Sequence, residues 1–158
     1  MSDHAADVEG LRPFYEAGYA EESELFARWR TLGGAGKARH VAALCARAGL
    51  EPQAVVDIGC GEGALLAELS RRGIGEVLDG FELSPTAVEL ARRRRVPRAR
   101  HVEVYDGRHV PAPDGAYALA VLSHVVEHVA EPLPLLREAG RVADHVIVEV
   151  PLEANRSA

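Results

Sequence analysis

The sequence predicts a three-layer α/β/α fold, in which one mainly parallel, doubly wound sheet lies between two layers of helices. Beyond residue 36, short apolar segments alternate with segments of helical periodicity, and this alternation is typical of parallel sheets. Apolar runs such as residues 118–122 fit strands that are buried on both faces. The 158 residues, 47% of them hydrophobic, suffice for one domain with its own core.

The elements follow from periodicity and turn residues. Helices are predicted at residues 21–31 and 37–48, on either side of a flexible glycine-rich stretch at 33–36. Alternating elements follow: strands at 54–58, 77–82, 101–104, 117–123 and 145–150, and helices near 63–71, 85–94 and 132–140. Ser84 is the expected N-cap of the helix that begins at Pro85, a residue tolerated in the first turn.

A turn with alternate glycines directly follows the first predicted strand. Gly59, Gly61 and Gly63 lack the Cβ atoms that would keep a ligand away from backbone amides, and the next helix points its unpaired N–H groups at the same place. Asp57, at the end of the strand, disfavours a phosphate and favours a cationic or amine-bearing ligand. The turn is therefore a predicted cofactor site.

Polar side chains also stand at the carboxyl ends of the other predicted strands. Glu82 ends the second strand, Asp106 follows the third, and Ser123 ends the fourth. Ligands of doubly wound α/β proteins bind at this edge of the sheet. The two carboxylate oxygens of Glu82 suit the two hydroxyls of a ribose.

These motifs resemble those of the class I S-adenosylmethionine-dependent methyltransferases, whose fold is Rossmann-like. Asp-Ile-Gly-Cys-Gly-Glu-Gly at 57–63 is similar to the first motif of that family, and Val-Leu-Asp-Gly-Phe-Glu-Leu-Ser-Pro at 77–85 to the second. Residues 104–107, 110–115 and 121–129 resemble later motifs, so that the match spans roughly 37–151. The resemblance implies S-adenosylmethionine as cofactor and methyl transfer to a small-molecule acceptor, at an oxygen, nitrogen or carbon atom.

The resemblance also implies roles for individual residues. The methionine part of the cofactor is expected at Asp57, Gly59, Cys60, Gly61 and Gly63, the ribose at Glu82, and the adenine at Leu83, Asp106 and Gly107. Ser123 is expected beside the cofactor, and His124 is expected to line the pocket and to act as a general base. In-line methyl transfer depends chiefly on positioning, which is why the sequence does not identify the acceptor.

Two other enzyme classes match parts of the same motifs. Residues 59–64 satisfy G-x-G-x-x-A, and Glu82 follows at about the distance expected in nicotinamide oxidoreductases. Asp57, which would repel a pyrophosphate, disfavours that alternative. Residues 124–128 also fit the H-x-x-E-H signature of a zinc peptidase class, but His124 directly follows a strand and no third metal ligand is evident. No bound metal is expected.

Composition limits the remaining classes. The net charge of −6 does not favour nucleic acid, and the arginines at 92–95 fit a solvated helix end better than a patch for nucleic acid or an acidic substrate. A cytoplasmic location is expected, since no apolar run is long enough for a membrane span and the N-terminus is polar. Cys45 and Cys60 are expected to be free thiols. The excess of arginine over lysine indicates a GC-rich bacterial genome.

The expected organisation has two parts. Residues 1–36 form a helical segment whose aromatic side chains either cover the site as a lid or simply pack a helix: Phe14, Tyr15, Tyr19, Phe26 and Trp29. Residues 37–158 form the cofactor-binding domain, expected to be incomplete because the family continues beyond the fifth strand. That strand would be an exposed sheet edge, which favours a homodimer. The non-enzyme alternative is an inactive cofactor-binding subunit or fragment that needs a partner.

Overall fold

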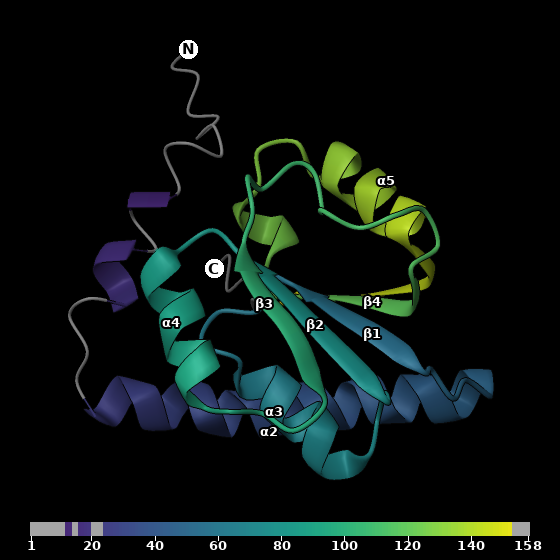
Figure 1. The fold of residues 1–158 in the computed structure, drawn as a ribbon, viewed down its shortest axis with the longest axis horizontal. Helices are drawn as coiled ribbons and strands as arrows, with labels where there is room; N and C mark the ends of the chain where they lie inside the picture. The colour runs from purple at the N-terminus through teal and green to yellow at the C-terminus, as the bar shows by residue number, and fades with distance from the viewer. Residues whose placement is uncertain (1–11, 14–15, 20–23, 153–158) are drawn as a thin grey trace, which may run out of the picture.

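The computed structural model describes residues 12–13, 16–19 and 24–152 and confirms the Rossmann-like fold (Figure 1). Five parallel strands form one sheet in the order β3-β2-β1-β4-β5. Their bounds are β1 Ala54–Ile58, β2 Val77–Glu82, β3 Ala99–Val104, β4 Tyr117–Ser123 and β5 Ala143–Glu149. The strand order reverses between β1 and β4, which places a ligand crevice at their carboxyl ends.

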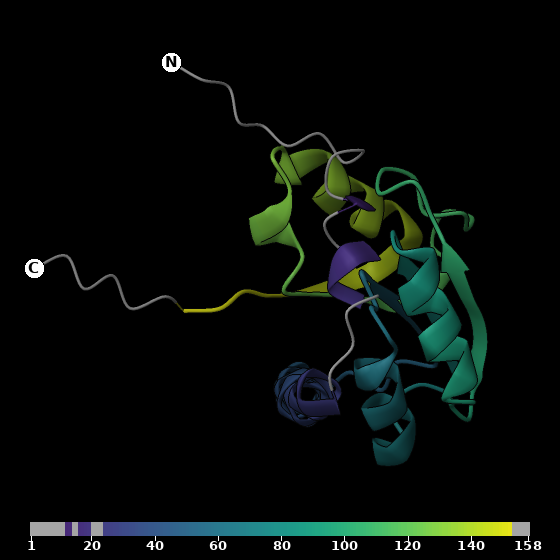
Figure 2. The same ribbon diagram turned by 90° about the vertical axis from the view of Figure 1, so that its left-hand side faces the viewer.

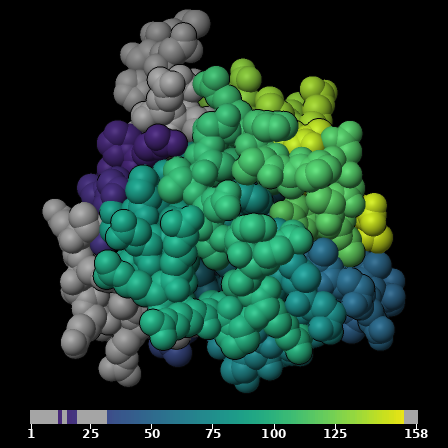
Figure 3. All heavy atoms as spheres, in the orientation of Figure 1, coloured from purple at the N-terminus to yellow at the C-terminus, as the bar shows by residue number. Residues whose placement is uncertain are grey.

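Helices cover both faces of the sheet (Figure 2). They are α2 Glu24–Ala48, α3 Ala64–Arg72, α4 Pro85–Arg93 and α5 Pro132–Val142, with a 3₁₀ turn, η1, at Val126–His128. One buried cluster joins α2, α3 and α4 to the sheet, and a second joins α5 to the opposite face. In the space-filling view, residues of α4, β3 and the loop after β3 form much of one side of the molecule (Figure 3).

The first long helix differs from the prediction. Two helices separated by a flexible glycine stretch were expected, but α2 runs without interruption from Glu24 to Ala48. Each glycine inside a helix costs about 1 kcal/mol relative to alanine. At Gly34 the absence of a side chain is required, because a Cβ atom there would lie 2.9 Å from the backbone carbon and oxygen of Ala64. The glycine therefore brings α2 close to the start of α3.

The other predicted elements are present with small shifts at their ends. β3 begins at Ala99 and β5 at Ala143, two residues before their predicted starts, and α5 continues to Val142. Ser84 caps α4 as predicted, since its hydroxyl accepts a hydrogen bond from the backbone N–H of Ala87 at 3.1 Å. None of the described helices is long and apolar enough to cross a membrane.

β5 is an edge strand within the described sheet, where it pairs with β4 alone. Three apolar side chains near this edge are exposed, namely Val146, Val148 and Val150. Self-association through this edge stays a prediction, as does the division of the chain at residue 36.

The arginine run at the end of α4 is engaged mainly with the protein itself. Arg94 donates to the Glu62 carboxylate at 2.5 Å, and Arg92 donates to the carbonyl oxygen of Val102 at 2.8 Å. Arg93 pairs with Glu89 at 3.5 Å on the exposed side of the helix. Arg92, Arg93 and Arg95 are exposed, as predicted for a solvated helix end, while Arg92 and Arg94 also bond to neighbouring parts of the protein.

Candidate functional site

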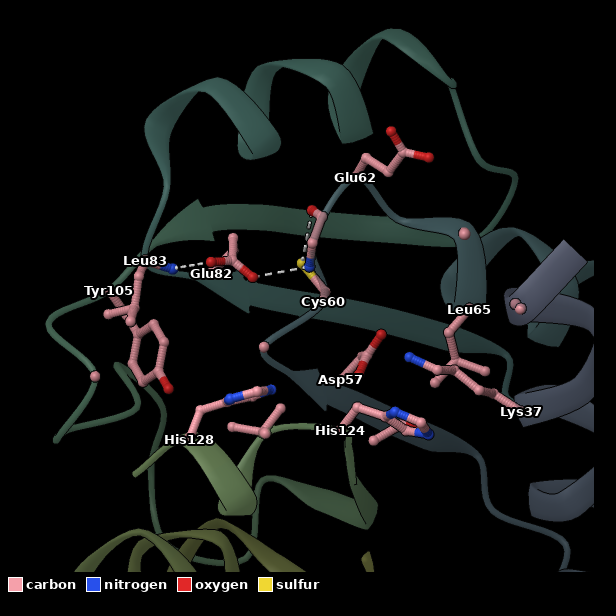
Figure 4. Close-up of a pocket in the computed structure, with 18 of the residues that line it drawn as sticks. Lys37, Asp57, Cys60, Glu62, Leu65, Glu82, Leu83, Tyr105, His124 and His128 are labelled. Atoms are coloured by element: carbon pink, nitrogen blue, oxygen red, sulfur yellow. Dashed lines mark hydrogen bonds between the residues drawn. The ribbon is translucent and has the colours of Figure 1, made fainter. Parts of the chain in front are cut away.

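A cavity of about 220 Å³ opens at the carboxyl ends of β1, β2 and β4 (Figure 4). Its walls come from α2, the glycine turn, the end of β2, the loop after β3 and the β4–η1 corner. Nine of the predicted site residues line it: Asp57, Gly59, Cys60, Gly61, Glu82, Leu83, Gly107, Ser123 and His124. The fold thus gathers at one place residues that are up to 67 positions apart in the sequence, from Asp57 to His124.

The glycine turn is shaped as predicted, and amides of the turn donate to β2. Gly59 and Gly61 have φ of 82° and 54°, in the left-handed region that favours glycine. The N–H groups of Gly59 and Cys60 donate to the carbonyl oxygen of Phe81 at 2.7 and 3.1 Å, and that of Gly61 donates to Glu82. These bonds hold the turn against β2, and the expected contact of the turn amides with the cofactor stays a prediction.

The glycines instead allow other cavity-lining residues to pack closely against the turn. A Cβ atom at Gly59 would lie 2.5 Å from a methyl group of Val125, and one at Gly61 would lie 2.7 Å from the Tyr19 hydroxyl. Gly63 does not line the cavity; it lies at the N-cap of α3, where a Cβ atom would meet Ala91 at 3.1 Å. Its place in the turn is therefore explained by helix packing.

Glu82 ties the turn to the end of β2. One carboxylate oxygen accepts from the N–H of Gly61 at 2.9 Å, and the other accepts from the N–H groups of Leu83 at 2.6 Å and Ser84 at 3.1 Å. A carboxylate has about four acceptor positions, so these three bonds leave capacity for a ligand hydroxyl. Glu82 is buried in the protein, yet it lines the cavity.

Asp57 lies fully buried on the cavity floor. Burial raises the pKa of Asp57 to about 7, the charge of Lys37 acts to lower it, and the charge of Glu82 acts to raise it. Lys37 projects from α2 toward this carboxyl group (Figure 4). The carboxyl groups of Asp57 and Glu82 therefore lie in the same cavity as the ammonium group of Lys37. This arrangement suits a ligand that is cationic at one end and anionic at another.

Cys60 has none of the properties of a catalytic nucleophile. Its side chain is buried, and burial together with the charges of Asp57 and Glu82 raises the pKa of the Cys60 thiol well above its ordinary value. A thiol held protonated is a poor nucleophile. Cys60 and Cys45 are both free, as the sequence predicts.

Asp106 lies outside the cavity, contrary to the expectation that it meets the adenine. Its carboxylate accepts from the N–H groups of Arg108 at 2.8 Å and His109 at 2.7 Å. The hydrogen bond from the His109 backbone, opposed by desolvation, holds the pKa of Asp106 below its ordinary value. These bonds are typical of an Asx turn, which brings the neighbouring Gly107 to the cavity wall.

His124 occupies a strained corner immediately after β4. Its φ of 59° is uncommon for a residue with a side chain, and such outliers concentrate at functional sites. Its Nδ1 lies 3.9 Å from a carboxylate oxygen of Glu127, and His128 Nε2 lies 3.8 Å from the same oxygen. The H-x-x-E-H residues lie on this corner and one 3₁₀ turn, and no group of described residues is arranged to hold a metal ion.

Several residues of the cavity wall were given no role from the sequence. Lys37 reaches the cavity from α2 and Leu135 from α5, while Tyr105, Val125 and Val129 reach it from the loops after β3 and β4. Lys37 is the only lysine of the chain and follows the glycine stretch, and this is the signal that would have identified it.

The N-terminal segment contributes to the site through residues 16–19. Tyr19 lines the cavity, and Glu16 accepts hydrogen bonds from the hydroxyls of Ser84, at 2.5 Å, and Thr86. These contacts place the segment beside the N-terminus of α4. Of the other aromatic residues proposed for a lid, Phe14 and Tyr15, and the side chains of Phe26 and Trp29, lie outside the described part of the structure.

Comparison with known proteins identifies similar chains. Residues 56–145 match the protein family described as "Methyltransferase domain". A trans-aconitate 2-methyltransferase from Mycolicibacterium gilvum is 38% identical over 103 residues, which are 64% of this chain and 39% of the relative. The chain thus spans about two-fifths of the length of this curated relative.

Two solved structures share the fold. A SAM-dependent methyltransferase from Aquifex aeolicus has a TM-score of 0.51 and 25% identity, over 58% of this chain and 50% of that one. Magnesium protoporphyrin IX methyltransferase from Synechocystis PCC 6803, solved with bound SAH, has a TM-score of 0.67 and 20% identity, over 90% of this chain and 71% of that one. The named acceptors of these relatives differ widely in size and chemistry.

Proposed function

The chain belongs to the methyltransferase-domain family of S-adenosylmethionine-dependent enzymes, and we propose that it transfers the methyl group of this cofactor to a small-molecule acceptor. The observation that carries the proposal is the shared cavity of the glycine turn and Glu82, formed at the carboxyl ends of the adjacent strands β1 and β2.

The residues present fit the cofactor. At Gly59 and Gly61 the place of a Cβ atom is taken by Val125 and Tyr19, so a side chain at either position would displace residues that line the cavity. Glu82 would hold the ribose hydroxyls, Leu83 the adenine, and Asp57 and Lys37 the charged groups of the amino-acid end. When bound, the cofactor supplies an electrophilic methyl group on a sulfonium. The protein contributes orientation and exclusion of water, which provide a large share of such rate accelerations.

Glu82→Ala is expected to weaken S-adenosylhomocysteine binding by about 1–3 kcal/mol, because a charged hydrogen-bond acceptor is lost and the Gly61 amide loses its partner. Isothermal calorimetry measures this change. Glu89→Ala is the matched control, since that glutamate lies exposed on α4 and pairs only with Arg93 in the described contacts. Equal affinities for the wild type and Glu82→Ala would rule out the ribose assignment.

Binding of S-adenosylmethionine is expected to tighten as the pH rises through 7. Asp57 is protonated below a pKa of about 7 and gains a negative charge above it, which favours the cationic cofactor. The expected change is about tenfold in Kd between pH 6 and 8. Asp57→Asn should remove this pH dependence, and a variant that retained it in full would show that another group titrates.

The same shift reduces the stability of the free protein at neutral pH. The folded state keeps a proton on Asp57 that the unfolded chain releases near its ordinary value of 3.8. The stability that the folded state gains by keeping this proton is therefore fully present below about pH 4, and it is lost as the pH rises through about 7.

His124 is the proposed general base. It lies on the cavity wall at the end of β4, in a backbone conformation that its environment must stabilise. Neutral imidazole accepts a proton from an acceptor hydroxyl or amine as that atom attacks the methyl group. The direct test of the proposed function is formation of S-adenosylhomocysteine with a panel of small oxygen, nitrogen and carbon acceptors. No turnover with a panel that includes carboxylic acids, phenols and amines would contradict it.

A further inference from the structure

Glu149, the last residue of β5, contacts both walls of the cavity without lining it. One carboxylate oxygen accepts from the Ser123 hydroxyl at 2.7 Å, and the other lies 2.5 Å from His40 Nδ1. Ser123 belongs to β4, whereas His40 belongs to α2, one turn beyond Lys37. A single carboxylate therefore links the helix that forms one wall to the strand that leads into the opposite corner.

The backbone of Glu149 supports the same corner. Its carbonyl oxygen accepts a hydrogen bond from the N–H of His124 at 2.8 Å. This bond fixes a residue whose φ of 59° costs energy for any side chain. The strained corner is thus held by β5 through backbone and side chain together.

The charge state of Glu149 suits this arrangement. Although burial acts to raise it, the hydrogen bonds from Ser123 and His40 and the charges of His40 and His124 hold the pKa of Glu149 below its ordinary value. The carboxylate is therefore ionised at neutral pH.

We infer that Glu149 is a positioning residue: it holds the His124 corner against α2 and thereby positions His124 for its role as general base. The second part of this inference rests on the proposed function. The first part concerns the free protein and stands on the contacts alone. No contact of Glu149 with the acceptor or the cofactor is involved.

Other titratable groups also surround His124 and must be separated from Glu149. They are Glu127 and His128 on η1, Lys37 and His40 on α2, and Asp57 on β1. Glu149→Gln changes the charge while keeping the size of the side chain. Glu127→Gln removes the other carboxylate near His124 but leaves the contacts to Ser123 and His40 intact, so it is the matched comparison.

The first readout needs neither cofactor nor acceptor. Imidazole NMR signals of His40 and His124 are compared in the ligand-free wild type and in both variants. In Glu149→Gln both signals should change position, because the His40 ring loses its carboxylate partner and the His124 corner loses its link to α2. In Glu127→Gln the His40 signal should stay unchanged. Unchanged signals of His40 and His124 in Glu149→Gln would overturn the inference.

The second readout separates positioning from binding. With a competent acceptor, Glu149→Gln should lower kcat by about tenfold, while the Kd for S-adenosylhomocysteine stays within about twofold. A tenfold loss of cofactor affinity with kcat intact would overturn the inference. Changed NMR signals in a protein that transfers no methyl group would refute the proposed function and leave the structural role of Glu149 supported.

Discussion

Asp79→Ala is expected to destabilise the fold by about 3 kcal/mol, because it leaves the buried Tyr117 hydroxyl without its acceptor and removes a buried carboxylate that pairs with Arg100. The Asp79 carboxylate, 1% exposed, accepts from the Tyr117 hydroxyl at 2.8 Å, from the Arg100 guanidinium at 2.6 Å, and from the N–H of His101 at 3.0 Å. These partners come from β4 and β3, on either side of β2 and β1. The carboxylate on β2 thus links three of the five strands, β2, β3 and β4.

Urea denaturation followed by circular dichroism measures this change in the free energy of unfolding. Asp114→Ala is the matched control, since it also removes an aspartate paired with an arginine, but that aspartate is 83% exposed. Its expected cost is below about 1 kcal/mol. Equal losses in the two variants would show that the buried network contributes nothing beyond a surface ion pair.

His124→Asn is expected to lower kcat by about 10²–10⁴-fold, the usual range for loss of a general base. Asparagine tolerates the left-handed backbone of this corner, so the variant should keep the fold and bind S-adenosylhomocysteine with nearly unchanged affinity. Turnover at saturating cofactor, measured with an acceptor identified from the panel, decides the outcome.

His145→Asn provides the control for this change. That histidine lies on β5, exposed and outside the cavity, with its Nδ1 3.3 Å from the carbonyl oxygen of Ala118. It should retain full activity. If His124→Asn retained it too, methyl transfer would need no base at this position and would depend on positioning alone.

Much of the fold is readable from the sequence because its signals are local. The apolar strand at 54–58, the glycines at 59 and 61, and Ser84 before Pro85 each depend on immediate neighbours in the chain. The packing of the uninterrupted helix α2 depends instead on a contact between Gly34 and Ala64, which are 30 positions apart in the sequence. Local propensity at 33–36 gave the wrong prediction there.

The site shows the same division. The motifs predict that Glu82 and the glycine turn lie at the cavity. They do not predict the hydrogen bonds from the turn amides to the Phe81 carbonyl oxygen, because these depend on the pairing of β1 with β2. The sequence does not indicate the hydrogen bonds of Asp79. Arg100 reaches the Asp79 carboxylate beside an irregularity in the register between β2 and β3. Long-range geometry of this kind is absent from a single sequence.

Calorimetric titration of the chain with S-adenosylhomocysteine, and separately with NAD, tests the central claim most directly. A methyltransferase cofactor site at the glycine turn and Glu82 predicts one S-adenosylhomocysteine per chain with a Kd of about micromolar order, and no saturable heat with NAD. Saturable binding of NAD without binding of S-adenosylhomocysteine would contradict the assignment and identify the turn as a dinucleotide site.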